Sequence, residues 1–155
     1  MSDLARAQGV RDVVTRIAHT IDFRRWSDLR ALYADQVRTD YTSLFGGEVQ
    51  QQRADDLIEG WRRLLSPLHA TQHLLGPIAV QLQGGTAIAE CHVRGYHVMR
   101  GAAGGDELMV AGQWLIELSE RGDAWRITSM TLKTLYQSGN EGILPQATPG
   151  PAPQP

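Results

Sequence analysis

Apolar residues recur at helical spacing in the first part of the chain. A stripe of five branched aliphatic residues predicts an amphipathic helix over about residues 4–21. Its members are Val10, Val13, Val14, Ile17 and Ile21. A shorter helical pattern follows, and its apolar positions are Trp26, Leu29, Leu32 and Tyr33. A third helix is predicted over about residues 53–65, where Pro67 ends it.

The period of the pattern is two in the remaining ordered segments. Residues 37–41 alternate and predict a short strand with Val37, Thr39 and Tyr41 on one face. Further strands are expected at about residues 70–75, 78–83, 86–99, 107–119 and 124–136, separated mostly by turns rich in Gly. Helices followed by a long antiparallel meander predict an α+β fold, in which a curved sheet wraps around three N-terminal helices.

The composition fits one domain and a tail. With 155 residues, 42% of them hydrophobic, the chain is sized for a single core, expected within residues 1–136. Residues 137–155 are rich in Pro and Gly and poor in large apolar residues, so they cannot bury enough surface to order themselves. The sequence therefore predicts a flexible tail, dispensable for folding from about residue 142 onward.

The charge balance excludes several classes of partner. The chain has 15 Lys and Arg against 17 Asp and Glu, a formal net charge of -2, and its arginines are scattered. We therefore expect no nucleic-acid or anionic membrane partner. No apolar run approaches the roughly 20 residues of a membrane span, so a soluble, cytoplasmic protein is expected. Cys91 is the single cysteine, which rules out an intramolecular disulfide and a cysteine-based metal site.

Two histidines lie on faces predicted to point inward. His73 shares a face with Leu75, and His97 ends the inward row of the longest alternating segment. The other members of that row are Ala87, Ala89, Cys91, Val93 and Gly95. A single inward histidine is more typical of a satisfied core residue. Together with Asp22 at a helix junction and Tyr41 at a strand end, however, the two histidines favour a functional site.

Each candidate has a simpler structural interpretation. Asp22 could cap the second helix, and Tyr41 could place its hydroxyl at the rim of the core. Two histidines and a carboxylate could also form a facial metal site, but no local metal motif accompanies them, so no metal or other cofactor is expected. Among the tryptophans, Trp114 is expected in a pocket. The three expected to pack in the core are Trp26, Trp61 and Trp125.

Four short motifs resemble scytalone dehydratase and related SnoaL-like proteins of the nuclear transport factor 2-like superfamily. They are Trp-Ser-Asp-Leu-Arg at residues 26–30, Thr-Asp-Tyr at 39–41, Thr-Gln-His at 71–73 and Trp-Arg-Ile at 125–127. The similarity covers roughly residues 10–132 and implies the cone-shaped, cystatin-like α+β fold of that superfamily. It departs from scytalone dehydratase at Ile21, where that family has a second tyrosine, and at Gly112 and Trp114, where it has a serine and an asparagine.

The resemblance also implies an activity. It places Asp22, Tyr41 and the two histidines where the family keeps its catalytic groups, with Asp22 expected to orient His97, His73 to move a proton and Tyr41 to polarise a carbonyl. The implied function is that of a cofactor-independent dehydratase (lyase) or isomerase acting on a small hydrophobic carbonyl compound of polyketide, aromatic or steroid type. The side chains expected to bind this substrate are Ile21, Leu75, Val93 and Trp114.

Two alternatives remain open at the level of the sequence. One is a SnoaL-like polyketide cyclase, and the other is a non-catalytic small-molecule or protein binding module, because one fold hosts many functions. The outward row of the sheet mixes aromatic, Arg and apolar residues, which predicts a homo-oligomer, a dimer or a trimer. Its members are His92, Arg94, Tyr96, Met109, Gln113 and Leu115.

Overall fold

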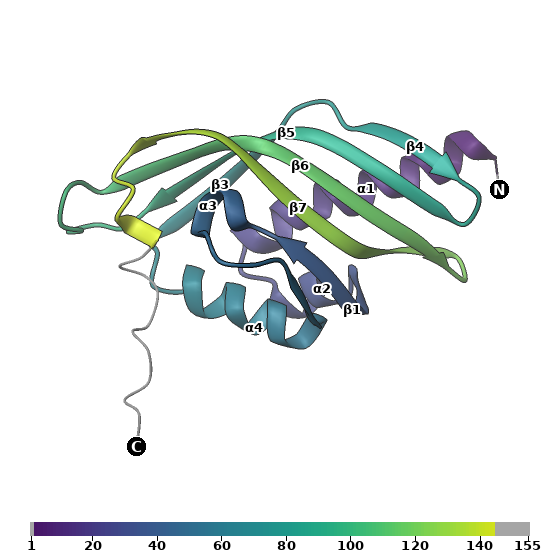
Figure 1. The fold of residues 1–155 in the computed structure, drawn as a ribbon, viewed down its shortest axis with the longest axis horizontal. Coiled ribbons are helices and arrows are strands. Elements are labelled where there is room, and N and C mark those ends of the chain that lie inside the picture. The colour runs from purple at the N-terminus through teal and green to yellow at the C-terminus, as the bar shows by residue number, and fades with distance from the viewer. Residues whose placement is uncertain (1, 145–155) are drawn as a thin grey trace, which may run out of the picture.

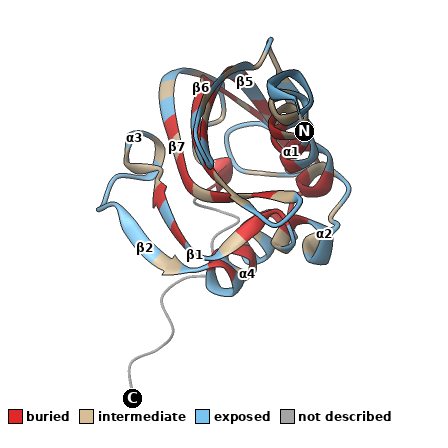
Figure 2. Ribbon diagram, turned by 90° about the vertical axis from the view of Figure 1, so that its right-hand side faces the viewer, coloured by how far each residue is buried: buried red, intermediate tan, exposed pale blue. Residues whose placement is uncertain are grey.

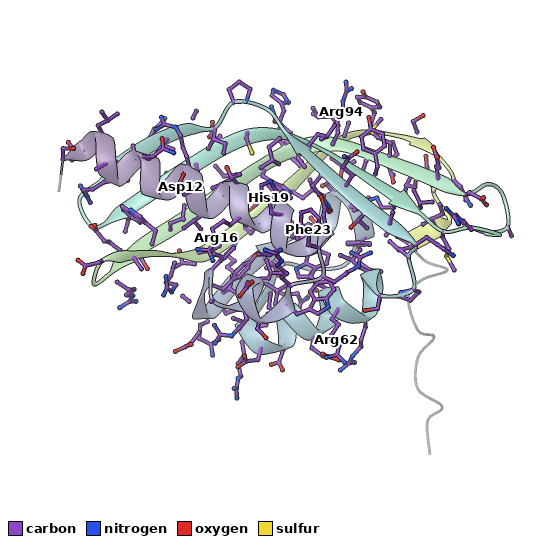
Figure 3. All side chains as sticks on the ribbon, turned by 180° about the vertical axis from the view of Figure 1, so that it is seen from behind. Asp12, Arg16, His19, Phe23, Arg62 and Arg94 are labelled. Atoms are coloured by element: carbon purple, nitrogen blue, oxygen red, sulfur yellow. The ribbon has the colours of Figure 1, made fainter. Side chains whose placement is uncertain are left out.

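The first apolar stripe forms helix α1 (Asp3–Asp22). A computed structural model of the protein describes residues 2–144. Ser2 caps the helix, because its hydroxyl accepts a hydrogen bond from the amide of Ala5 at 3.3 Å. The predicted stripe is buried, whereas the opposite side of α1, marked in Figure 3 by Asp12, Arg16 and His19, is exposed. The predicted helix is thus confirmed.

The segment between α1 and β3 contains more elements than its pattern predicts. Its elements are α2 (Trp26–Arg30), β1 (Tyr33–Asp40), α3 (Thr42–Phe45), β2 (Gln50–Arg53) and α4 (Ala54–Leu65). The third predicted helix is confirmed as α4. Tyr33 is not helical but begins β1, Tyr41 is not in the strand but precedes α3, and neither α3 nor β2 was expected. Both missed elements are only four residues long, too short for a period to register.

The strands of the second half lie close to their predicted positions. They are β3 (Ala70–Leu75), β4 (Ala79–Gln83), β5 (Thr86–Val98), β6 (Glu107–Arg121) and β7 (Ala124–Gly139). The sheet has seven strands in the order β2-β1-β7-β6-β5-β3, with β4 also paired to β5. Within residues 2–144, every strand pair is antiparallel except β1 with β7, which is parallel. Figure 1 shows this sheet curving over the helices, with α1 behind it and α4 below, which confirms the α+β cone.

The concave face of the sheet carries the core. Alternate residues of β5 are buried, including Val93 and His97, as their inward row predicts. Figure 2 shows buried and less buried residues alternating along the strands, with further buried residues on α1. On the outer face His92 and Arg94 are exposed, and Leu115 is 39% exposed. Oligomerisation through this face stays a prediction.

The chain between β7 and the end of the described residues is attached to the domain. β7 continues to Gly139, beyond the expected domain end at residue 136. The Asn140 side-chain amide then donates to the carbonyls of Ala103 and Gly105 at 2.9 and 2.7 Å. Ile143 and Leu144, which the composition assigned to the tail, are 0% and 3% exposed and belong to the core. The remainder of the predicted tail lies outside the described residues.

We expect Ile143→Ala to destabilise the protein. The side chain is fully buried, and removing it leaves a cavity that typically costs about 2 to 5 kcal/mol. Glu141→Ala is the matched control, because Glu141 is exposed and its truncation changes stability by less than about 0.5 kcal/mol. Urea unfolding of both variants measures the difference. Equal stabilities would mean that this segment does not dock in solution.

Candidate active site

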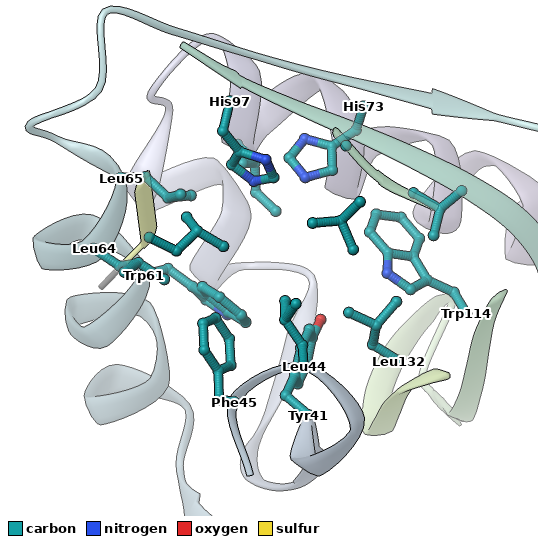
Figure 4. Close-up of a pocket in the computed structure, with 15 residues that line it drawn as sticks. Tyr41, Leu44, Phe45, Trp61, Leu64, Leu65, His73, His97, Trp114 and Leu132 are labelled. Carbon is teal, nitrogen blue, oxygen red and sulfur yellow. The ribbon is translucent and has the colours of Figure 1, made fainter. Parts of the chain in front are cut away.

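A cavity opens between the concave face of the sheet, α3 and α4. Its empty volume is about 540 Å³ when the open space at its mouth is included. Aromatic and aliphatic side chains make most of its wall, with Trp114 on one side and Trp61 and Phe45 on another (Figure 4). Most of the polar groups in this wall come from His73, His97 and Tyr41. The cavity therefore combines an apolar surface with a few convergent polar groups.

The end of α1 brings Asp22 to this cavity. The helix ends in a Schellman motif, in which the amide of Arg24 donates to the carbonyl of Ile21 at 3.1 Å and that of Arg25 to the carbonyl of Thr20 at 2.8 Å. Arg24 occupies the left-handed position of this motif, with φ of 57°, and is the one non-glycine residue with positive φ among those described. An L-residue there costs roughly 1 kcal/mol relative to glycine. The turn directs Asp22 towards β3.

Asp22 and His73 form a hydrogen-bonded pair. His73 Nδ1 lies 2.7 Å from Asp22 Oδ1, and the His73 amide donates to Oδ2 at 2.7 Å. The hydroxyl of Thr71 adds a third donor to Oδ1 at 3.1 Å. Burial alone would raise the pKa of Asp22, but the hydrogen bonds and charge of His73, with the bond from Thr71, outweigh it and lower the pKa. The ionised carboxylate only accepts, so the proton of neutral His73 resides on Nδ1 and Nε2 is left as a base.

The expected pairing of Asp22 with His97 is wrong. The hydrogen bonds of Asp22 go to β3, the edge strand beside the end of α1, whereas His97 lies one strand further away on β5, opposite Thr71. His97 Nδ1 is buried without a hydrogen-bond partner among the described residues. Burial, with the neighbouring charge of His73, lowers the pKa of His97 to about 4. The imidazole of His97 is therefore neutral at pH 7.

Gly95 allows the two histidines to approach each other. Their ring centroids are 5.8 Å apart and the rings are nearly perpendicular. A Cβ on Gly95 would stand 3.2 Å from His73 Nε2 and 3.2 Å from His97 Cε1, tighter than ordinary contact. The sequence placed Gly95 in the inward row but did not indicate that the two histidine rings meet beside it. On the far side of His73 the indole of Trp114 stacks at 6.0 Å between centroids.

Tyr41 faces the histidines across the cavity. Its hydroxyl oxygen points into the cavity, and its ring contacts Trp61 edge to face at 4.9 Å between centroids (Figure 4). Burial, with a contribution from Tyr33, raises the pKa of Tyr41 well above its usual value, so the hydroxyl stays protonated. Asp22 does not cap α2, because the N-cap position of that helix is Arg25, which makes no side-chain capping hydrogen bond.

Of the four predicted substrate-binding residues, three line the cavity and one does not. Ile21, Val93 and Trp114 line the cavity, whereas Leu75 is partly buried against the core and does not line it. Leu75 lies beyond His73 on β3, opposite Val93 of β5. Sharing a strand face with His73 therefore did not bring it to the cavity.

The sequence misassigned or missed several lining residues. Trp61, expected in the core, lines the cavity, and so do Phe45 and Leu44 of the unexpected helix α3 and Leu144 of the expected tail. Trp125 is buried in the core as expected, and Trp26 packs partly buried against it. The sequence predicted the apolar face of α4. It did not predict which residues of that face pack in the core and which line the cavity, because this depends on the curvature of the sheet.

The geometry gives no position for a metal ion within residues 2–144. No group of three or more His, Cys, Asp or Glu side chains in this part of the chain is arranged to hold one. Cys91 is buried, which raises the pKa of its thiol to about 11 and makes it a poor nucleophile. What the site offers is acid-base chemistry by an imidazole, with two further polar groups facing it.

The fold is that of the nuclear transport factor 2-like proteins, and the chain belongs to the SnoaL-like domain family, whose model matches residues 2–131. No curated protein sequence matches significantly. Among solved structures, the Kfla4162 protein from Kribbella flavida is 24% identical with a TM-score of 0.86, and the match covers 92% of this chain and 99% of that one.

No helix among the described residues is both long and apolar enough to cross a membrane.

Two further structures share the fold at lower identity. A provisionally named scytalone dehydratase from Novosphingobium aromaticivorans is 13% identical, with a TM-score of 0.75 and 89% coverage of both chains. A hexachlorocyclohexane dehydrochlorinase from Novosphingobium barchaimii is 16% identical with a TM-score of 0.71, and the match covers 90% of this chain and 92% of that one. At such identities these matches establish the shared fold alone.

We expect acid to destabilise the protein through His97. Its pKa is 6.5 in the unfolded chain and about 4 in the folded one, so between these values the unfolded state binds more protons. Stability from this group is complete above pH 6.5 and falls by about 3 kcal/mol as the pH drops to 4. His97→Gln should remove this contribution, as measured by urea unfolding across the range. His92→Gln on the exposed face should keep the slope of the parent, and an equally steep slope in both variants would contradict the assignment.

Proposed function

We propose that the protein is a cofactor-independent dehydratase-type lyase or isomerase, which removes a proton next to the carbonyl of a small hydrophobic substrate. The observation that carries this proposal is the Asp22–His73 pair in the wall of an apolar cavity. In solvent, water would compete with a substrate for the imidazole of such a base. In a largely apolar cavity the imidazole can act on a bound substrate without that competition.

The first step is proton abstraction by His73. With Nδ1 held by Asp22, the lone pair of Nε2 takes the α-proton of the substrate, and the C–H electron pair moves into the carbonyl to form an enolate. The imidazolium formed is stabilised by the adjacent carboxylate, whose lowered pKa keeps it ionised. Asp22 thus orients the base and neutralises the charge that develops on it.

The enolate oxygen requires hydrogen-bond donors on the other side of the substrate. Tyr41 supplies a protonated hydroxyl that points into the cavity, and the neutral ring of His97 supplies one N–H. Both groups are held by surrounding packing before substrate arrives, so little reorganisation accompanies the charge shift.

The fate of the proton distinguishes the two reactions. In a dehydration, the imidazolium of His73 protonates the β-hydroxyl as its C–O bond breaks, and water and an enone are released. In an isomerisation, the same proton returns to the γ-carbon of a dienolate. Both reactions leave the enzyme unchanged and need no external oxidant or reductant.

Two findings favour catalysis over a simple binding role. The cone contains a cavity, and both histidines line it. Relatives by fold include proteins named as a dehydratase and a dehydrochlorinase, and loss of water and loss of hydrogen chloride both require a base that removes a carbon-bound proton. The aromatic walls formed by Trp61, Trp114 and Phe45 suit a substrate with a ring.

We expect Asp22→Asn and His73→Asn each to lower turnover by about 10² to 10⁴, because each removes part of the base. A first substrate is the aldol adduct of benzaldehyde and acetone, a β-hydroxy ketone whose dehydration gives an enone that is followed by ultraviolet absorbance. A β,γ-unsaturated steroid ketone tests isomerisation in the same way. The control is Asp28→Asn, an exposed carboxylate of α2, which should retain parental turnover. Full activity in either site variant would remove that residue from the mechanism.

Tyr41→Phe tests the proposed oxyanion contact. Loss of one donor to an enolate typically costs about 10² in turnover, while the ring contact with Trp61 remains and the melting temperature should stay close to that of the parent. The loss should appear in kcat more than in KM, because the hydrogen bond strengthens as charge develops. A variant with unchanged kcat would show that the hydroxyl does not touch the reacting carbonyl.

A further inference from the structure

We propose that Arg24 is a positioning residue, which holds Asp22 in place through Thr71 and so fixes the tautomer of His73. The inference rests on the proposed function, because it assigns Arg24 a part in preparing the same base. Arg24 does not line the cavity, and sequence reasoning did not single it out.

The contacts form a continuous chain from the guanidinium to the imidazole. Arg24 Nη1 donates to Thr71 Oγ1 at 2.9 Å, and Thr71 Oγ1 donates to Asp22 Oδ1 at 3.1 Å. The same carboxylate oxygen faces His73 Nδ1 at 2.7 Å. Thr71 is 8% exposed, so water does not readily replace these bonds.

The direction of the Thr71 bond follows from donor and acceptor counting. A hydroxyl has one proton to donate, and a guanidinium can only donate. When Arg24 donates to the oxygen of Thr71, the hydroxyl proton is left for the carboxylate of Asp22. Without Arg24 the hydroxyl is free to turn to another acceptor, and Asp22 loses one of the three donors that fix its orientation.

The backbone provides an independent argument for the side chain of Arg24. The residue stands in the left-handed position of a Schellman motif, where glycine is the usual and less strained choice. Burial also lowers its pKa, opposed by the charge of Asp22, so the cation is kept partly away from water. Arg24 therefore has an unfavourable backbone conformation and a partly buried charge. We explain its presence by the contacts of its side chain. The side chain also donates to the carbonyl of Ile21 at 3.2 Å and lies over the ring of Trp26, but its bond to Thr71 is the contact that leads to Asp22 and His73.

Arg24→Gly is the decisive variant, because it suits the backbone and removes only the side chain. We expect its melting temperature to stay close to that of the parent, because the relieved backbone strain offsets the lost contacts with Ile21 and Trp26. The kcat for the aldol adduct should fall about tenfold, and KM should change little. Arg24→Lys keeps a cationic donor and should recover most of the activity. Arg25→Gln, at the adjacent exposed arginine, should behave as the parent.

A spectroscopic measurement tests the inference without any substrate. Nitrogen-15 NMR of the histidine rings, assigned with the help of His73→Asn, distinguishes a proton on Nδ1 from one on Nε2. The parent should show His73 protonated on Nδ1, and Arg24→Gly should shift a measurable fraction to Nε2. Thr71→Val should give the same shift, and Thr71→Ser should not.

The double variant completes the test. If Arg24 acts through Thr71, Arg24→Gly in the Thr71→Val background should produce no further change in tautomer or kcat. Additive losses, or an unchanged tautomer in Arg24→Gly, would overturn the proposal. If the tautomer shifts as expected but His73→Asn retains full turnover, the positioning role stands and the proposed catalytic function fails.

Discussion

The carboxylate of Asp22 is the group on which the site depends. It is largely withdrawn from solvent, and burial by itself would favour its neutral form. Three donors from β3 reverse that preference and keep it charged. Because α1 ends at this residue, one carboxylate joins the helix to the edge strand of the sheet and at the same time polarises an imidazole. The hydrogen bonds that attach the end of α1 to β3 are therefore the same ones that orient the imidazole of His73.

The two histidines acquire different roles from different surroundings. His73 has a carboxylate partner, whereas His97 is buried beside a second imidazole without one and is neutral. Identical side chains one strand apart therefore differ in character, since one imidazole is paired with a carboxylate and the other is buried and neutral. The arrangement depends on Gly95, since any side chain there would push into both rings.

Much of the fold followed from hydrophobic periodicity, because α1, α4 and the strands of the meander are long enough for a period to be counted. The inward row of β5 correctly placed His97, and the face of β3 placed His73. The partner of Asp22 did not follow, since periodicity gives the face of a strand but not which strand adjoins the helix end. The positions of Phe45 and Leu144 in the cavity wall depend on a short helix and a docked segment that have no period.

The single parallel pairing of the sheet has a consequence for how the protein is made. β1 lies near the beginning of the chain, and its partner β7 near the end of the described residues, so the register of Tyr33 opposite Ile127 cannot form until most of the chain has been synthesised. Leu144, further still, closes part of the cavity wall. A nascent chain can assemble the hairpins of β5 and β6 early, since these contacts are local. The cavity wall is therefore completed last, and until then the nascent chain exposes the apolar residues that later line the cavity.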